Sequence, residues 1–229
     1  MFCHHCGTQV SQDAQFCANC GQAVGVAVLA PDTLTAWTPP PVVRVTAGRW
    51  LGEGWDIVKA DLGTYVLITL IFFLLSSVPF IQGALIAGFH IYTMKKLMRR
   101  NAEFADIFKG FNFFVPTLVA SILIGIFVFV GFLFLIIPGL VIAAMYKFTY
   151  LFIVDKRMDF WPAMKASHDV VRKDYFGFTM FMILAFLVNV VGFLCLFVGL
   201  LVTVPLTFAA ITVAYRDVVG FEPRTLDTL

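Results

Sequence analysis

Residues 110–146, GFNFFVPTLVASILIGIFVFVGFLFLIIPGLVIAAMY, contain no Asp, Glu, Lys or Arg. Residues 62–94 and 175–215 are equally free of these charged residues, so the three segments are 33, 37 and 41 residues long in chain order. A hydrocarbon core about 30 Å thick is crossed by roughly 20 apolar helical residues. Each segment is therefore too long for one crossing and about long enough for two, the first only tightly.

Each charge-free segment is interrupted near its middle by small residues or proline, at Ser76-Ser77-Val78-Pro79, at Ile137-Pro138-Gly139 and at Val204-Pro205. Broken helices in transporters also contain Gly and Pro. Here, however, the interruptions coincide with the turns that the segment lengths require, and proline suits the first turn of a helix. The sequence predicts an all-α integral membrane protein: three helical hairpins, or six transmembrane helices, over residues 49–220, with a cytoplasmic tail at residues 221–229.

The composition supports the same class of protein. The chain is 60% hydrophobic and 13% charged, with a mean hydropathy of +0.91, whereas ordinary soluble domains are about 25% charged. A chain with this much apolar surface is best solvated by a lipid bilayer. The formal net charge of +2 is too small to suggest a nucleic-acid partner.

Basic residues predict the orientation of the hairpins. Lys and Arg occur before the first hairpin, in both connections between hairpins and after the last hairpin, but not in the three predicted outer turns. The positive-inside rule therefore places both termini in the cytoplasm. Residues 1–25 lack the basic start and apolar core of a signal peptide, so the first transmembrane helix is expected to direct insertion.

An amphipathic segment precedes each hairpin, near Trp50, near Phe104 and near Trp161. Apolar residues recur in these segments at helical spacing. They are expected to be interfacial helices lying along the lipid, with protein interaction surfaces as the alternative. Within the hairpins, Gly125, Gly131, Gly192 and Gly199 are expected to provide small surfaces for close helix packing.

Four of the five cysteines form two pairs near the N-terminus, Cys3-x2-Cys6 and Cys17-x2-Cys20. This spacing is typical of a tetrahedral zinc site, and four thiolates would complete the coordination shell. The sequence therefore predicts structural Zn²⁺ bound by Cys3, Cys6, Cys17 and Cys20. Two disulfides would require an oxidising compartment; a redox-active pair, or substitution of one thiolate by His4 or His5, is a further alternative.

The N-terminal module spans residues 1–23 and is joined to the membrane region by a proline-containing linker, residues 24–48. Phosphate contacts require Lys or Arg, and residues 1–43 contain neither, with Asp13 and Asp32 as their only charged side chains. This excludes DNA or RNA as a partner of the ribbon and favours a protein contact or a cap over the cytoplasmic face of the assembly.

The motif Phe2-Cys3-x2-Cys6-Gly7 and its repeat Phe16-Cys17-x2-Cys20-Gly21 resemble the short zinc ribbons of many prokaryotic membrane proteins. That resemblance implies that the four cysteines are the zinc ligands. Residues 49–220 more loosely resemble bacterial six-helix membrane proteins of unknown function related to the membrane domain of glycerophosphodiester phosphodiesterases. No phosphodiesterase domain is attached, so that activity is not implied.

Few polar side chains fall in the apolar segments. The segments contain no Asp or Glu, which weakens an ion-transport hypothesis, and Lys147 is expected to reach the cytoplasmic surface through its flexible stem. His90 is expected to hydrogen-bond a neighbouring carbonyl or, alternatively, to line a cavity, and Asn189 is expected to hydrogen-bond between helices. The consecutive residues 167–169, Ser-His-Asp, fan around a helix and do not predict a hydrolytic triad.

These observations predict a non-enzymatic scaffold or accessory subunit of a prokaryotic cytoplasmic (inner) membrane. Its partners would be the lipid bilayer and either another protein or a second copy of the chain. The alternative function is a transporter or channel for a lipid-like or apolar solute. A polar cavity between the hairpins would favour this alternative, whereas a solidly packed membrane region would favour the scaffold.

Overall fold

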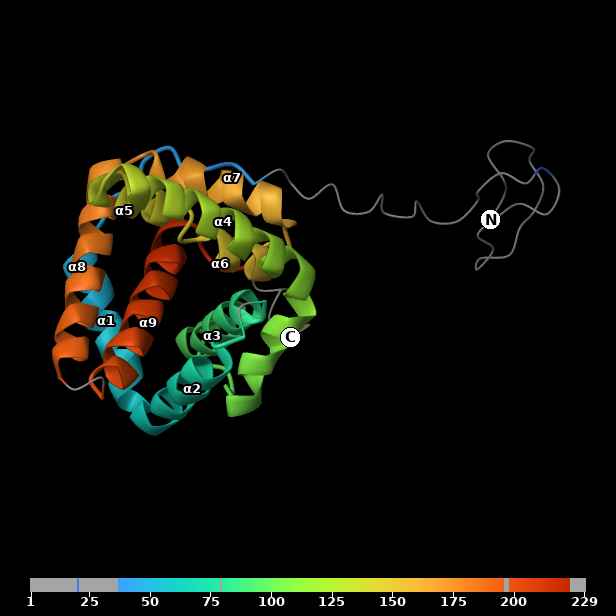
Figure 1. The fold of residues 1–229 in the computed structure, drawn as a ribbon. Helices are drawn as coiled ribbons and strands as arrows, with labels where there is room; N and C mark the ends of the chain where they lie inside the picture. Colours follow the sequence, from blue (N-terminus) through green and yellow to red (C-terminus); the bar gives the residue numbers. More distant parts are fainter. Residues whose placement is uncertain (1–19, 21–36, 79, 196–197, 223–229) are drawn as a thin grey trace. The chain divides into compact units, whose positions relative to one another are not determined.

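The computed structural model describes residues 20, 37–78, 80–195 and 198–222. Helices are the only regular secondary structure in this part of the chain (Figure 1). The chain divides into two compact units, Met1–Thr38 and Pro39–Leu229. The helices of the second unit are α1 (Ala47–Ala60), α2 (Leu62–Leu75), α3 (Gln82–Leu97), η1 (a 3-10 helix, Phe104–Phe113), α4 (Phe114–Phe134), α5 (Ile136–Met145), α6 (Thr149–Asp155), α7 (Phe160–Val171), α8 (Tyr175–Leu194) and α9 (Leu200–Val218).

Four helical stretches of the described chain are long and apolar enough to cross a membrane: Phe104–Phe134, Ile137–Asp155, Tyr175–Leu194 and Leu200–Val218. They correspond to the second and third predicted hairpins. A fifth candidate results if α1 and α2, which are bent by 98° at their junction, are counted as one broken span.

The first predicted hairpin is shorter than its charge-free segment suggests. Helix α2 has 14 residues and α3 has 16, which at 1.5 Å per residue gives lengths of about 21 and 24 Å, less than a core of about 30 Å. The turn between them takes up residues 76–81, and α3 already includes Lys95 and Lys96 near its end. Two crossings by this hairpin, and therefore six crossings in total, stay a prediction.

The turn of the third hairpin lies earlier than predicted. Helix α8 ends at Leu194 and α9 begins at Leu200, so Pro205 lies inside α9 and not at a turn. Gly192 and Gly199 explain the earlier turn, because their backbones are in contact and a Cβ on either residue would overlap the other glycine or Thr203. The predicted packing role of these two glycines is thereby confirmed.

The three amphipathic segments form α1, η1 and α7. Helix α1 packs into the bundle and does not lie only along lipid. Trp50 is fully buried against Phe178 and Phe181 of α8, with ring centroids 6.0 and 5.2 Å apart. Exposed indoles suited to the headgroup region are found instead at Trp55 and Trp161.

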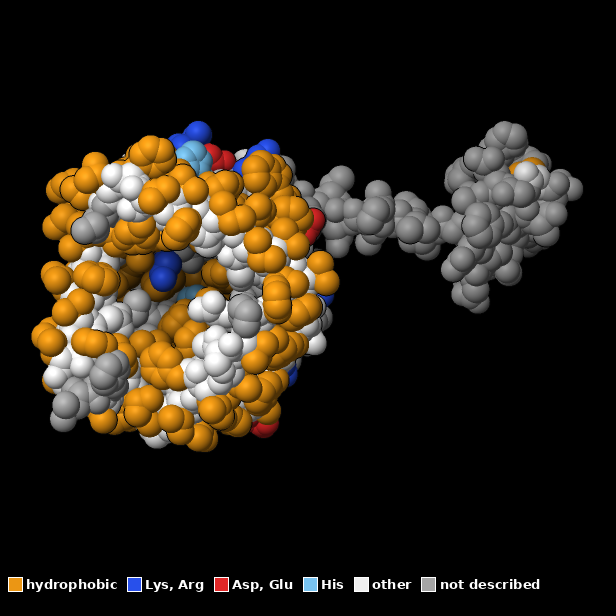
Figure 2. Space-filling view, viewed as in Figure 1, with side chains coloured by type: hydrophobic (Ala, Val, Ile, Leu, Met, Phe, Trp, Pro, Cys, Tyr) orange, Lys and Arg blue, Asp and Glu red, His pale blue; other side chains and the backbone are white. Residues whose placement is uncertain are grey.

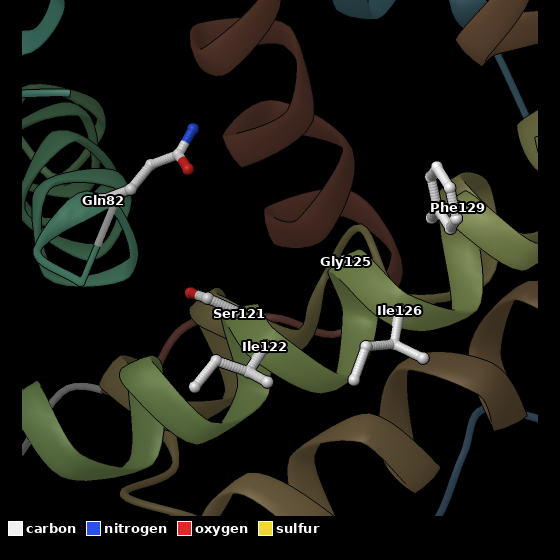
Figure 3. A pocket seen from close by; sticks show the side chains of 6 residues that line it. All are labelled: Gln82, Ser121, Ile122, Gly125, Ile126 and Phe129. Carbon is white, nitrogen blue, oxygen red and sulfur yellow. The ribbon is translucent and has the colours of Figure 1, made fainter. Parts of the chain in front are cut away.

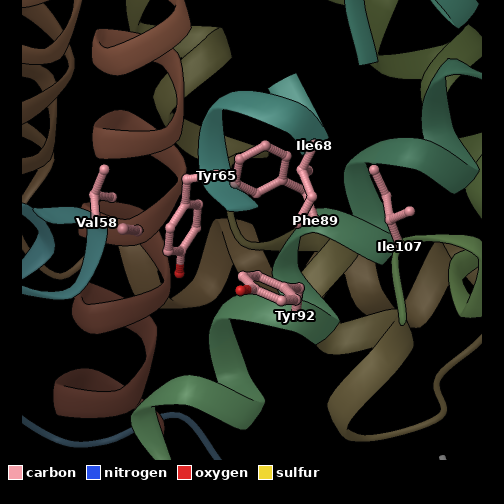
Figure 4. Close-up of a cluster of buried hydrophobic side chains, with 7 residues drawn as sticks. Val58, Tyr65, Ile68, Phe89, Tyr92 and Ile107 are labelled. Atoms are coloured by element: carbon pink, nitrogen blue, oxygen red, sulfur yellow. The ribbon is translucent and has the colours of Figure 1, made fainter. Parts of the chain in front are cut away.

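A cluster of buried side chains joins helices that are distant in sequence (Figure 4). Tyr65 of α2 contacts Tyr92 of α3 edge to face at 5.1 Å, and Phe89 of α3 stacks on Phe208 of α9 at 4.6 Å. Helix association in lipid depends on such packing because lipid tails are as apolar as the side chains. The cluster consists of Val58, Tyr65, Ile68, Phe89, Tyr92, Ile107 and Ala209.

The closest backbone approach in this region is between α3 and η1. A Cβ on Gly88 would overlap the carbonyl group of Ile107, and a Cβ on Gly110 would overlap the carbonyl oxygen of Ala84. Only glycine permits two backbones to come this close. The short helix η1 is thereby fixed against α3 before the chain continues into α4.

Candidate functional site

The described part of the chain contains a groove of about 350 Å³ along α4, beside the start of α3 (Figure 3). Gln82 and Ser121 give one end of the groove polar groups, and Phe129 lies at the other end. The wall between them is apolar. The groove is lined by Gln82, Ser121, Ile122, Gly125, Ile126 and Phe129.

The polar end of the groove is connected to α6. Ser121 donates a hydrogen bond of 2.6 Å to the carbonyl of Thr117, one turn earlier in α4. Its oxygen also lies 3.0 Å from the hydroxyl of Tyr150. Because the single proton of Ser121 is used on Thr117, Tyr150 is the donor in the second hydrogen bond. The hydroxyl of Ser121, which lines the groove, is thereby connected to Tyr150 of α6.

Gly125 keeps the middle of the groove open. It was predicted to support close helix packing, and that prediction is wrong, because a Cβ at Gly125 would meet nothing within 4 Å. By contrast, a Cβ on Gly131, on the same helix, would contact the backbone of Gly139 at 2.9 Å. The small side of Gly125 thus faces the groove and not another helix.

The candidate span Ile137–Asp155 is broken between α5 and α6. At this break Ser167 of α7 donates a hydrogen bond of 2.7 Å to the carbonyl of Met145 and accepts one of 3.1 Å from the amide of Phe148. A break inside an apolar span is tolerated where the freed backbone groups find other partners. Ser167 supplies those partners and fixes the conformation of the residues between them.

Lys147 lies in this break, and its reach to the cytoplasmic surface stays a prediction. The residue falls within the candidate span and is half-buried. The side chain of Lys147 makes no hydrogen bond or ion pair with any described residue. Ionisable side chains at such depth face the interior of a bundle or a cavity.

The space-filling view agrees with this placement. Figure 2 shows an apolar face that is hollowed near its centre, with a basic side chain and a histidine side chain visible inside the hollow. Basic side chains are otherwise seen at the margin of this face. A cation surrounded by apolar side chains has lost much of its hydration without gaining a protein partner.

Two other polar residues of the apolar segments hold helices together. Nδ1 of His90 lies 2.8 Å from the hydroxyl of Thr212 in α9, so the partner of His90 is a hydroxyl group and not the predicted carbonyl. Asn189 of α8 donates to the hydroxyl of Thr207 in α9 at 2.7 Å, which confirms the predicted hydrogen bond between helices. Asn189 also donates to the carbonyl of Ala185 at 2.8 Å.

The prediction that the spans contain no carboxylate is wrong for Asp155. The span extends beyond the charge-free segment because α6 continues to this residue, which is fully buried. Asp155 accepts a hydrogen bond of 2.9 Å from the hydroxyl of Tyr215 and another of 2.9 Å from the amide of Glu222. Lys156 lies 3.4 Å from the carboxylate. These contacts compensate the negative charge of Asp155 at the end of the span.

Other charged residues form contacts between helix ends. Glu53 of α1 pairs with Arg216 of α9, and Lys95 of α3 pairs with Asp106 of η1 at 2.7 Å. Breaking such buried pairs is costly because the remaining charge is left without a partner. They fix the ends of the helices against one another.

Asp61 belongs to the same group and lies at the junction between α1 and α2, outside both helices. It accepts hydrogen bonds from Tyr92 at 2.6 Å and from Thr64 at 2.7 Å, and it pairs with Lys96 at 2.6 Å. Burial alone would raise the pKa of Asp61, but the hydrogen bonds from Lys96, Tyr92 and Thr64 outweigh it and lower the pKa to about 2.

The consecutive Ser167, His168 and Asp169 do not converge on one point. The hydroxyl of Ser167 is directed to the break between α5 and α6, whereas Nε2 of His168 lies 2.9 Å from the hydroxyl of Tyr175. Their side chains fan around α7 as its helical geometry requires.

The predicted zinc ligands Cys3, Cys6 and Cys17 lie outside the described residues. Cys20 is described and exposed. The part of the chain that the structure describes contains no group of three or more His, Cys, Asp or Glu side chains suited to a metal ion. The ligand assignment therefore stays a prediction, and its donor set of four thiolates is the one that structural zinc prefers.

Comparison with known families identifies the N-terminal module. Residues 2–24 match the family model of the zinc-ribbon domain, so the chain carries a zinc ribbon before its helical unit. No curated protein and no solved structure matches the chain.

Proposed function

We propose that the protein is a non-enzymatic, multi-pass accessory protein of a prokaryotic inner membrane whose cytoplasmic zinc ribbon contacts a protein partner or caps the assembly. The observation that carries this proposal is the combination of a zinc-ribbon match over residues 2–24 with four or five candidate membrane-spanning helices in the same chain. A ribbon without Lys or Arg in residues 1–43 suits a protein contact better than nucleic acid. The resemblance of residues 49–220 to the glycerophosphodiester phosphodiesterase membrane domain is part of the same proposal.

The proposed topology has six crossings with both termini in the cytoplasm. Ser77→Cys in the first turn and Asn101→Cys after α3, each in a background without the native cysteines, test it through accessibility to a membrane-impermeant maleimide. Ser77→Cys should react in intact cells, and Asn101→Cys only after the membrane is opened. Protection of Ser77→Cys in intact cells together with reaction after opening would show a re-entrant first hairpin and overturn six crossings.

The scaffold proposal is tested by isolating the protein from native membranes. Proteins that remain bound to the full chain should be lost from Cys3→Ser/Cys17→Ser, if the folded ribbon makes the contact. The matched control is Cys195→Ala, which removes an exposed thiol outside the ribbon. Retention of the same partners by the ribbon variant would contradict a role for the ribbon in binding.

A second candidate function is binding or transport of a lipid-like solute. The groove along α4, with polar groups at one end and apolar residues along its length, specifically favours it. Its volume of about 350 Å³ is at the lower end of ordinary ligand sites. Mass spectrometry of the protein released from native membranes tests this candidate: a stoichiometric lipid species should remain bound, and loss of all lipid without loss of folding would contradict it.

A further inference from the structure

We propose that the groove along α4 binds one acyl chain of an anionic amphiphile, whose carboxylate or phosphate group pairs with the ammonium group of Lys147. The proposal rests on the second candidate function and names its ligand class. It identifies Lys147 as the counter-ion and the α4 wall as the chain-binding surface.

The charge of Lys147 is the first reason. The residue lies within a candidate membrane span, and its side chain makes no hydrogen bond or ion pair with a described residue. Other charged residues of the bundle, such as buried Lys95 with Asp106 and partly buried Arg216 with Glu53, do have partners of opposite charge. A cation in an apolar setting is costly unless an anion or water compensates it, and an anionic headgroup would supply that compensation.

The position of Lys147 relative to the groove is the second reason. Lys147 precedes Tyr150 by three residues in a tight helical turn, in which such residues share one face. Tyr150 in turn hydrogen-bonds Ser121 at the polar end of the groove.

A third observation is an unused hydroxyl beside the break. Oγ1 of Thr149 is fully buried and has no hydrogen-bond partner among the described residues. Threonine in a helix usually bonds a carbonyl of the preceding turn, as Thr117 does with Phe113 at 2.7 Å. A buried polar atom left without a partner in a native fold needs another group to satisfy it. Thr149 is the first residue of α6, directly after the break that contains Lys147.

The shape of the groove limits the ligand to one chain. Ile122, Ile126 and Phe129 line the groove beyond its polar end, and a Cβ at Gly125 would meet nothing within 4 Å, so the space beside Gly125 is open. A volume of about 350 Å³ lies near the lower limit for drug-sized ligands. A fatty acid, a lysophospholipid or one chain of a diacyl lipid therefore fits better than two chains together.

Binding of spin-labelled stearate to the full chain in phosphatidylcholine nanodiscs tests the proposal, with the motionally restricted fraction as the readout. Lys147→Met should weaken stearate binding about 10- to 100-fold, as expected for loss of a charge-assisted contact. Lys147→Arg should keep most of the affinity because it keeps the charge. The matched control Lys165→Met removes an exposed lysine that lies over the ring of Trp161, and it should change nothing.

A second variant tests the groove independently of the charge. Gly125→Leu places a side chain in the open part of the groove and should reduce binding of stearate and of neutral oleyl alcohol alike. Gly63→Leu is its control, because a Cβ at Gly63 also meets nothing within 4 Å but lies on α2 outside the groove. Circular dichroism and thermal unfolding identify any variant that fails to fold.

The outcomes distinguish the role of Lys147 as the counter-ion from lipid binding by the groove. Equal stearate affinity in the wild type and in Lys147→Met, with a loss in Gly125→Leu, would overturn the role of Lys147 but leave lipid binding standing. No loss in either variant would overturn both. Competition by oleate and lysophosphatidate at similar concentrations supports recognition of the negative charge, whereas competition by phosphatidate alone would identify a membrane lipid as the source of the chain.

Discussion

Ser167 contributes two hydrogen bonds at a position where the backbone would otherwise lack partners. Ser167→Ala leaves the carbonyl of Met145 and the amide of Phe148 without them. Loss of a buried partner costs about 1 to 3 kcal/mol, so the thermal midpoint of the purified protein in detergent should fall. The control Ser77→Ala removes an exposed hydroxyl that bonds only its own preceding turn. An unchanged midpoint for Ser167→Ala would contradict the role given to Ser167.

Asp61, at the junction of α1 and α2, makes the stability of the fold depend on pH. Because its folded pKa is lowered from 3.8 to about 2, the ionised carboxylate stabilises the fold above pH 3.8. This stabilisation is lost as the pH falls through the folded value. Asp61→Asn should therefore be less stable than the wild type near neutral pH, and the difference should shrink as the pH approaches 2. Thermal unfolding over this range measures it; a difference that grows on acidification would contradict the assignment.

At the scale of elements, the crossing of α3 and η1 depends on glycine. Gly88→Ala would place a Cβ on the backbone carbonyl of Ile107, which can move only if the two helices separate. Overpacking of this kind typically costs 1 to 3 kcal/mol and sometimes more, so a loss of about 3 kcal/mol or more is expected in chemical unfolding. Gly63→Ala, with open space at its Cβ, should be neutral or slightly stabilising. Similar effects of the two changes would refute the close crossing.

The helices of the second and third hairpins could be predicted because absence of charge over 37 and 41 residues leaves few alternatives to spanning helices. Their exact ends could not. Pro205 looked like a turn, but the contact of Gly192 with Gly199 places the turn earlier. The burial of Asp155 at the end of a span could not be predicted, because its hydrogen-bond partners, Tyr215 and the amide of Glu222, come from distant parts of the chain. Pairing between remote residues leaves no local sequence signal.

For the molecule as a whole, zinc binding by the N-terminal module should be independent of the folding of the helical bundle. Cys3→Ser together with Cys17→Ser is expected to lose about one equivalent of zinc, because removal of two thiolates leaves an incomplete tetrahedral site. The helical content of the membrane region should be unchanged. Atomic absorption on the purified protein gives the zinc content, and circular dichroism gives the helicity. Retention of stoichiometric zinc would contradict the four-cysteine assignment.

From the sequence, a cavity between the hairpins was considered only as support for the alternative function, and its lining residues were not predicted. Gln82, Ser121 and Gly125 are unremarkable small or polar residues of apolar segments, and nothing in their spacing indicates that they line one space. The importance of Lys147 was also hidden, because a lysine next to a charge-free segment usually extends to the membrane surface. The break beside Lys147 is fixed by Ser167, which comes from another helix.

The packing of α9 has a consequence for how the protein is made. Helices α1 and α2, which emerge first from the ribosome, pack against α9, and α2 contacts α9 more extensively than it contacts its own hairpin partner α3. Helices α1 and α2 therefore lack their main packing surface until α9 has been inserted. During synthesis these early helices must remain close to the insertion machinery or to lipid, and assembly of the bundle is completed by its last helix.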